Sequence, residues 1–198
     1  MTAPDAALDR QTLLDLLARY AYQFRPEGFT LVSGRVSQEY LDCKMALSHA
    51  EALPPLGRLF AATLDPRAVA VGGLTMGADP IAIATSAASA SGRAVRWFSV
   101  RKEAKEHGRK KLVEGDVPAN AEVVVVDDVV TTGGSTIQAI QKCRESGLRV
   151  VQVLALVDRE EDGGIARVQT EAGDGVPVRA LFTKSDVRAA WDAQQKKS

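Results

Sequence analysis

The chain has 198 residues, the size of one domain, and 45% of them are hydrophobic, which is enough for a buried core. Lys and Arg together number 25, as do Asp and Glu, so the net charge is zero and gives no support to a nucleic-acid or membrane partner. Cys43 and Cys143 lie far apart and outside any C-x-x-C or His/Cys cluster, which favours buried thiols in a reducing cytoplasm over a zinc site. The first residues contain aspartates and no apolar run, so we expect no signal peptide.

Leucines from Leu8 onward recur at helical spacing over residues 5–22, which predicts an amphipathic helix. Residues 27–44 contain two short apolar runs around a Ser-Gly break and predict a β-hairpin. Ser48 is the expected N-cap of a helix that runs to about residue 64, with Glu51 completing a capping box. Two prolines early in this helix indicate either a kink or a later start.

From residue 67 onward, strand patterns alternate with helix patterns. Strands are predicted over residues 67–73, 93–100, 121–128, 148–158 and 176–182, and helices over 78–90, 134–147 and 184–195, with a long loop over 101–120. Glycines and a proline interrupt the apolar stretch 68–92, so we expect a strand, a turn and a helix there rather than a membrane span. The alternation predicts βαβ units and an α/β fold with a mostly parallel central sheet flanked by helices.

The most informative stretch is EVVVVDDVVTTGGST, residues 122–136. It is a buried strand that ends in Asp127 and Asp128, followed by a loop of hydroxyls and glycines that opens a helix. Ligands bind at the carboxyl ends of strands in open α/β sheets, and a glycine-rich helix N-terminus is a ready anion site. The carboxylates can accept hydrogen bonds from a diol while the loop donates to a phosphate, as a sugar phosphate requires. The alternative is an ordinary capped strand-to-helix turn.

This stretch resembles the phosphoribosyl-pyrophosphate (PRPP) motif of the type I phosphoribosyltransferases, which is a hydrophobic strand, two acids and a Thr/Gly loop. The resemblance implies that Asp127 and Asp128 are catalytic and hold the ribose hydroxyls, while Thr131 to Thr136 hold the 5′-phosphate. It also implies the α/β fold of that family, with a small N-terminal hood. We therefore expect a single domain over residues 1–198, with a helix and hood over about 1–45 and the core over about 46–198.

Three further stretches resemble the orotate phosphoribosyltransferases within that family. RKEAKEHG (residues 101–108) resembles their catalytic loop, FTLVSGRVSQEYLD (29–42) their hood, and VDREEDGG (157–164) the segment whose arginine meets orotate. Together with the PRPP motif, these stretches cover most of the chain in the order of the family. The resemblance implies an enzyme of pyrimidine (UMP) biosynthesis that transfers the phosphoribosyl group of PRPP to orotate, giving orotidine 5′-monophosphate and pyrophosphate.

The segment that resembles the catalytic loop is rich in Lys and Arg between residues 101 and 111, with only Glu103 and Glu106 opposing them. A cationic loop can close over a pyrophosphate leaving group and exclude water from an oxocarbenium-like transition state. A charge run by itself is more often a solvated surface segment. The resemblance implies that Lys105 and His107 are catalytic and reach the site of a neighbouring subunit, so that the functional unit is a homodimer. The residues expected to contact PRPP are Arg101, Lys102, Lys105, His107, Asp127, Asp128, Val129, Val130, Thr131, Thr132, Gly133, Gly134 and Ser135.

The turn after the strand at 67–73 contains Thr75, Met76 and Gly77, which we expect to form the pyrophosphate turn. Gly72 and Gly73 are assigned to the same turn, because small residues let backbone N–H groups approach oxygen atoms. Tight packing would explain each single glycine equally well.

The sequence departs from the family at two lysines. Some members carry a lysine in the pyrophosphate turn, where this chain has Gly77, and many carry one in the hood, where this chain has Val32. Both changes remove a charge that would face a substrate. We expect Arg101 and Lys102 to take over part of the neutralisation of pyrophosphate.

Orotate has an exocyclic carboxylate, which a guanidinium group matches in a bidentate manner. Arg159 follows a predicted strand and is therefore expected at the same sheet edge as the acids, where it would bind orotate. Thr131 and Phe29 are the other expected orotate contacts. The alternatives are a surface arginine paired with Glu160 or Glu161, and a phenylalanine in the core of the hood.

The expected cofactor is Mg²⁺, because pyrophosphate needs a hard cation with oxygen ligands. PRPP and water would supply most ligands, with Asp127 or Asp128 acting through water, and direct binding by the two acids is the alternative. Rival functions are a phosphoribosyltransferase for another base and a non-catalytic PRPP-binding regulator. The expected partners are PRPP, orotate and a second copy of the chain, with no nucleic acid and no membrane, and the expected location is the cytoplasm.

Overall fold

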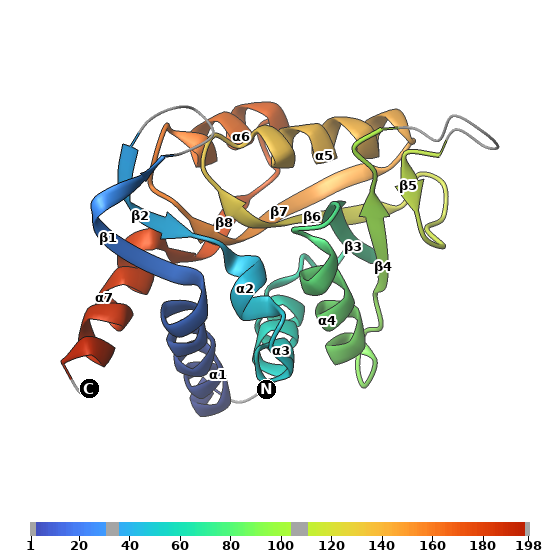
Figure 1. Cartoon of the computed structure of the whole chain (residues 1–198). Coiled ribbons are helices and arrows are strands. Elements are labelled where there is room, and N and C mark those ends of the chain that lie inside the picture. The colour runs from blue at the N-terminus through green and yellow to red at the C-terminus, as the bar shows by residue number, and fades with distance from the viewer. Residues whose placement is uncertain (1–2, 31–35, 104–110, 197–198) are drawn as a thin grey trace.

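The computed structural model describes residues 3–30, 36–103 and 111–196. Six strands form the central sheet in the order β5-β4-β3-β6-β7-β8 (Figure 1). Neighbouring strands are parallel except for the antiparallel pair of β4 and β5, which confirms the predicted mostly parallel sheet. The strands are β3 (Ala70–Leu74), β4 (Arg96–Val100), β5 (Val113–Glu114), β6 (Glu122–Val130), β7 (Arg149–Asp158) and β8 (Val178–Thr183).

Helices cover both faces of the sheet (Figure 1). One face carries α5 (Gly134–Glu145) and α6 (Gly164–Ala172), and the other carries α1 (Ala3–Leu16), α3 (Leu53–Thr63), α4 (Asp79–Ser89) and α7 (Lys184–Gln195). The bounds of α7 agree with the prediction, and a capping box formed by Thr183 and Asp186 fixes where the helix starts. The Thr183 hydroxyl accepts a hydrogen bond from the Asp186 amide at 3.1 Å, and the Asp186 carboxylate accepts one from the Thr183 amide at 2.8 Å.

The run of valines in β6 is explained by burial on both faces. Successive side chains of a strand point to opposite sides. Val123 and Val125 pack in the core cluster that contains Ile140 of α5. Val124 and Val126 pack in the other cluster, between the sheet and the helices on the opposite face. The strand therefore has no solvent-facing side until it reaches the carboxyl edge of the sheet.

The predicted hairpin is present as β1 (Tyr22–Thr30) paired antiparallel with β2 (Val36–Leu41). It starts earlier than predicted, because a π-helical turn at Leu17–Ala21 ends the first helix and Tyr22 enters the strand. Leu8, which was assigned to the apolar face of the first helix, is 68% exposed.

The hairpin rests on α7. The ring of Trp191 lies 5.5 Å from that of Tyr22 and 6.3 Å from that of Phe24. Glu39 of β2 accepts a hydrogen bond from the Tyr22 hydroxyl at 2.6 Å and forms ion pairs with Lys184 at 3.0 Å and Arg188 at 2.8 Å. Aromatic and charged contacts thus join the first hairpin of the chain to its last described helix.

The predicted capping box at Ser48 is wrong. Ser48 flanks the C-terminal end of a short helix, α2 (Cys43–Leu47), and its hydroxyl donates to the Met45 carbonyl at 2.8 Å. The later start suggested by the prolines is confirmed, since α3 begins at Leu53 with prolines in its first turn. Proline fits there because the first N–H groups of a helix have no partner within it.

Several elements were not predicted, among them α2, β5 and α6. The two-residue strand β5 lies within the expected long loop, where Ser99 pairs with Glu114 and Val100 with Val113. The segment after residue 163, which carried no assignment, forms α6. The apolar stretch 68–92 divides into β3, a turn and α4 as expected. No helix in the described ranges combines the length and apolar character needed to cross a bilayer.

Helices α3 and α4 approach closely at Gly57. A methyl carbon at this position would lie 2.8 Å from the Ala84 carbonyl carbon and 3.1 Å from the Ala88 methyl group. We expect Gly57→Ala to reduce the free energy of unfolding by about 1–3 kcal/mol, because overpacking forces backbone shifts. Gly92→Ala is the control, since the nearest atom to its added carbon is 4.0 Å away. Urea unfolding measures both, and equal midpoints for the two variants would contradict the close contact.

Candidate active site

The strand order creates a crevice between β3 and β6. The chain leaves β3 through α4 toward β4 on one side, and leaves β6 through α5 toward β7 on the other. The two loops therefore diverge at the carboxyl edge, which is where open α/β sheets bind ligands. A cavity of about 520 Å³ opens there. It is lined by Lys44, Leu74, Thr75, Met76, Gly77, Lys102, Asp127, Asp128 and Ser135.

The two acids at the end of β6 point to opposite sides of the sheet, as strand alternation requires. Asp127 turns toward α5 and is only 3% exposed. Its Oδ2 atom accepts hydrogen bonds from the Ser135 hydroxyl at 2.7 Å and the Thr136 hydroxyl at 2.6 Å, and its Oδ1 atom accepts one from the Asp128 amide at 3.0 Å. Asp128 turns toward α2, where its Oδ2 atom lies 3.4 Å from Lys44 Nζ. One acid thus orders the loop and the other faces a cation.

Burial raises the pKa of Asp127 to about 6, because its charged form loses solvation. The hydrogen bonds from Thr136 and Ser135 act in the opposite direction by favouring the carboxylate, and the charge of Asp128 adds to the upward shift. The carboxyl group that organises the loop therefore titrates close to neutral pH.

The loop after β6 is held against α6. Gly133 has φ +81°, in the left-handed region that favours glycine, and a methyl carbon there would lie 2.7 Å from the Val168 side chain. Gly133 gives α5 no side-chain cap. The first N–H groups of α5 and the positive end of its dipole therefore remain for an anion. Along the predicted PRPP-binding stretch, Val129 and Thr131 are half-buried, Val130 is buried, and Thr132 and Gly134 are exposed.

Lys44 is a cavity residue that the sequence analysis missed. Asp42 caps α2 by accepting a hydrogen bond from the Lys44 amide at 3.1 Å, and it also lies 2.8 Å from Lys44 Nζ. Partial burial alone would lower the pKa of Lys44, but the hydrogen bond to Asp42 and the charge of Asp128 raise it above its ordinary value. No motif in the sequence marks Lys44, because its place in the cavity depends on where the short helix α2 lies.

The predicted pyrophosphate turn lies in the cavity wall at Thr75, Met76 and Gly77. The Thr75 hydroxyl donates to Asp79 Oδ2 at 2.6 Å, which ties the turn to the start of α4. Met76 is 70% exposed. A methyl carbon at Gly77 would lie 2.9 Å from the carboxyl carbon of Asp128, so the turn passes directly beside that acid.

The assignment of Gly72 and Gly73 to this turn is wrong, because both lie within β3. A methyl carbon at Gly72 would lie 2.5 Å from the Phe98 ring, and one at Gly73 would lie 2.7 Å from the methyl group of Ala78. Their small size serves close packing of the strand, as the alternative interpretation held.

The start of the cationic segment is anchored by α5. Lys142 Nζ donates to the Arg101 carbonyl at 2.9 Å and also to the Lys102 carbonyl. Arg101 is half-buried, with Nη1 3.4 Å from Glu114, and its Nε atom has no hydrogen-bond partner within the described ranges. Lys102 is exposed and lines the cavity. The predicted catalytic residues Lys105 and His107 lie outside the described residues.

Arg159 lies beside the end of β6, since its amide donates to the Val130 carbonyl at 3.0 Å. It is buried rather than a surface residue, although the alternative ion pair with Glu161 exists at 3.4 Å. Glu161 also pairs with Lys184 at 3.1 Å. Among the described residues, no hydrogen bond reaches the Nε atom of Arg159. The guanidinium group therefore keeps a donor that an anionic ligand could use.

Phe29 packs within the hairpin. Its ring lies 5.5 Å from that of Tyr40, and the Arg25 guanidinium carbon lies 4.5 Å from its centre. This is the environment that the hood-core interpretation expects. Neither Phe29 nor Arg159 nor Thr131 is among the described residues that line the 520 Å³ cavity.

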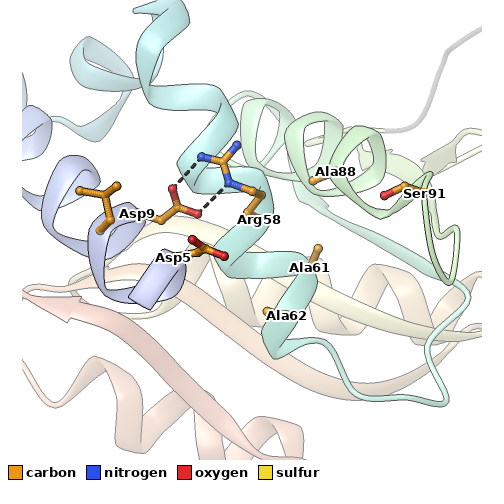
Figure 2. Close-up of a pocket in the computed structure, with 8 residues that line it drawn as sticks. Asp5, Asp9, Arg58, Ala61, Ala62, Ala88 and Ser91 are labelled. Carbon is orange, nitrogen blue, oxygen red and sulfur yellow. Dashed lines mark hydrogen bonds and ion pairs between the residues drawn. The ribbon is translucent and has the colours of Figure 1, made fainter. Parts of the chain in front are cut away.

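A second cavity, of about 550 Å³, lies between α1, α3 and α4 (Figure 2). Arg58 and Asp9 form a bidentate pair across it, with distances of 2.7 and 2.6 Å. It is also lined by Ala62 near the end of α3 and Ala88 near the end of α4, helices that lead into β3 and β4. This cavity is therefore at the amino edge of the sheet, away from the paired acids, and its charged groups already satisfy each other.

The sheet is mostly parallel, and the crevice between β3 and β6 brings together paired acids, lysines and a helix N-terminus rich in hydroxyl groups. This combination is that of a type I phosphoribosyltransferase fold. Orotate phosphoribosyltransferase from Thermosynechococcus vestitus is 46% identical over 182 residues, which cover 91% of this chain and 93% of that protein. The chain therefore belongs to the orotate phosphoribosyltransferase family. No protein-family model matches it.

Solved structures agree with this assignment. Mycobacterium tuberculosis orotate phosphoribosyltransferase in complex with Fe(III) dicitrate superposes with a TM-score of 0.77 at 36% identity, covering 90% of this chain and 98% of that chain. The same enzyme in complex with PRPP superposes with a TM-score of 0.70 at 32% identity, covering 94% of this chain and 93% of that chain.

The raised pKa of Asp127 predicts a pH dependence of stability. The folded chain binds this proton more tightly than the unfolded chain. The stability that the proton contributes is therefore complete below about pH 4, near the pKa of an aspartate in the unfolded chain, and is lost as the pH rises through the folded-state pKa of about 6. We expect Asp127→Asn to abolish this loss of stability at higher pH, because asparagine does not titrate. The variant should gain on the order of 2–3 kcal/mol relative to the unsubstituted chain between pH 4 and 7.

Denaturant unfolding across this pH range measures the effect. Asp116→Asn is the matched control, because the Asp116 side chain is 99% exposed. Its stability should parallel that of the unsubstituted chain at every pH. A difference between Asp127→Asn and the unsubstituted chain that stays constant with pH would contradict the assignment.

Proposed function

We propose that the chain transfers the phosphoribosyl group of PRPP to orotate, forming orotidine 5′-monophosphate and pyrophosphate in UMP biosynthesis. The observation that carries this proposal is the cavity at the switch point between β3 and β6, which joins both acids of the PRPP motif to the pyrophosphate turn. The family assignment and the PRPP complex of the M. tuberculosis relative support the same reaction.

Asp128 faces the cavity and accepts hydrogen bonds from the ribose diol. Asp127 orients the hydroxyls of Ser135 and Thr136 and adds a second negative charge beneath the sugar. The N-terminus of α5 and the surrounding loop bind the 5′-phosphate. Because the transition state gains positive charge on the ribose ring, two carboxylates at this edge stabilise it.

The bond from ribose C1 to the pyrophosphate oxygen breaks as an orotate ring nitrogen, which gives up its proton to water or to the pyrophosphate, forms the new bond to C1. Arg101 and Lys102, with Lys105 and His107 beyond the described residues, neutralise the departing pyrophosphate and keep water out. The anchor from Lys142 to the Arg101 and Lys102 carbonyls supports this role, because it fixes where the cationic segment begins.

Arg159 binds the orotate carboxylate, with Thr131 and Phe29 as further contacts. The support is the position of Arg159 next to the end of β6 and its Nε donor, for which the described part of the chain supplies no acceptor. Glu161, which also pairs with Lys184, helps to hold the guanidinium group in place. A neutral base lacks the carboxylate that such a cation recognises.

The proposed cofactor is Mg²⁺ carried by the diphosphate of PRPP. PRPP oxygens and water would supply most of its ligands, and Asp127 or Asp128 would act through water. When bound, the ion neutralises charge on the diphosphate. The acids and lysines of the cavity fit a ligand of that composition.

The proposed functional unit is a homodimer in the cytoplasm. Apolar side chains on three elements near the cavity support an association: Met45 is 53% exposed, Met76 70% and Ile83 47%. Each copy would contribute its cationic segment to the site of the other. The two buried free thiols, Cys43 and Cys143, support a reducing compartment.

Loss of orotate absorbance, followed with purified protein, PRPP and Mg²⁺, tests the reaction. We expect turnover with orotate and none with uracil or adenine. Turnover with another base would identify a different phosphoribosyltransferase. PRPP binding without turnover would identify a regulator.

Arg159→Gln tests acceptor recognition. We expect the KM for orotate to rise at least about tenfold while the KM for PRPP changes little, because a charge-assisted hydrogen bond contributes about 1.5–3 kcal/mol. Arg167→Gln is the control, since Arg167 is exposed on α6. Steady-state kinetics with each substrate varied separates the two constants, and an unchanged KM for orotate would exclude this role.

A further inference from the structure

The pyrophosphate turn lacks a cationic side chain, and in this chain the position of Gly77 is crowded by Asp128. The backbone of Gly77 passes so close to Asp128 that an added methyl carbon would lie 2.9 Å from the carboxyl carbon and still closer to one of its oxygens. Any side chain at this position would displace the acid that faces the ribose. A charge for the pyrophosphate must therefore come from another element.

Lys44 supplies a cation from the opposite wall of the same cavity. It belongs to α2, yet it lines the cavity together with Thr75, Met76 and Gly77. Its Nζ atom lies 3.4 Å from Asp128 Oδ2 and 2.8 Å from Asp42 Oδ1. Asp128 thus stands between the turn on one side and the ammonium group on the other.

The ammonium group has the capacity to bind a further anion. It carries three donors, and within the described part of the chain its contacts with the Asp42 and Asp128 carboxylates account for two of them. The Lys44 side chain is 48% exposed, so part of it faces the open cavity. Asp42 holds both the amide and the ammonium group of Lys44, which fixes the direction of the side chain.

We propose that Lys44 binds the pyrophosphate group of PRPP and takes the place of the lysine that the turn lacks. This inference rests on the proposed function and assigns one of its charges to a residue outside the PRPP motif and the cationic segment. By pairing with Asp128, Lys44 also offsets the negative charge of that carboxylate at the place where the diphosphate would bind. Lys44 is therefore a substrate-binding residue as well as the partner of an acid.

Calorimetric titration with two ligands separates direct binding from an effect through Asp128. Inorganic pyrophosphate and ribose 5-phosphate, each with Mg²⁺, are titrated into the unsubstituted chain, Lys44→Met and Lys44→Arg. We expect Lys44→Met to weaken pyrophosphate binding by about tenfold to a hundredfold, the range for a charge-assisted hydrogen bond. Its affinity for ribose 5-phosphate should stay within about threefold, and Lys44→Arg should retain most pyrophosphate affinity.

Arg149→Met is the matched control. Its ion pair with Glu122, at 2.9 Å, joins the amino ends of β6 and β7, and the Arg149 side chain is 68% exposed. Both ligands should bind this variant as they bind the unsubstituted chain. Thermal unfolding of Lys44→Met should also be unchanged, because half-exposed ion pairs stabilise folded proteins little.

The outcomes separate the two proposals. Equal weakening of both ligands by Lys44→Met would show that Lys44 acts only by positioning Asp128. Unaltered pyrophosphate affinity in that variant, with clear binding to the unsubstituted chain, would overturn this inference alone. Failure of the unsubstituted chain to bind pyrophosphate would overturn the proposed function and this inference with it.

Discussion

The site depends on one constraint, which is that β6 is buried on both faces of the sheet almost to its carboxyl end. A strand in this position must send consecutive side chains to opposite sides of the sheet. Two adjacent acids at its end therefore meet different neighbours, although both line the cavity. The Asp127 side chain lies on the face of the sheet that carries α5 and orders the loop. The Asp128 side chain lies on the other face, near α2, and contacts Lys44. The same alternation that builds the core divides the work between the two carboxylates.

Around this strand, the switch point gathers segments that are far apart in the sequence. The turn at Thr75 comes from the neighbouring strand, Lys44 from the short helix after the hairpin, and Lys102 from the segment after β4. Each is tied to the framework by its own contact, such as the Thr75 bond to Asp79 or the Lys142 bond to the Arg101 carbonyl. Segments from three parts of the chain thus meet at one cavity.

The sequence predicted what local pattern determines. The alternation of strand and helix patterns predicted the mostly parallel sheet and the bounds of α7, and a motif predicted the place of the acids. The sequence did not predict Lys44 in the cavity, because its distance to Asp128 depends on the packing of α2 against β6. The two-residue strand β5 exists only through its partner β4. Ser48 has the composition of an N-cap, but tertiary contacts place the helix start elsewhere.

The hairpin and α7 lie at opposite ends of the described chain, yet they hold each other in place. Glu39 of the hairpin pairs with Lys184 and Arg188, and Tyr22 packs against Trp191. During synthesis on the ribosome, the strands and turns that line the cavity, up to Ser135, emerge well before α7 does. The hairpin cannot gain these partners until residues 184–191 leave the exit tunnel. The hairpin, although it is near the start of the chain, is therefore among the last parts of a nascent chain to be completed.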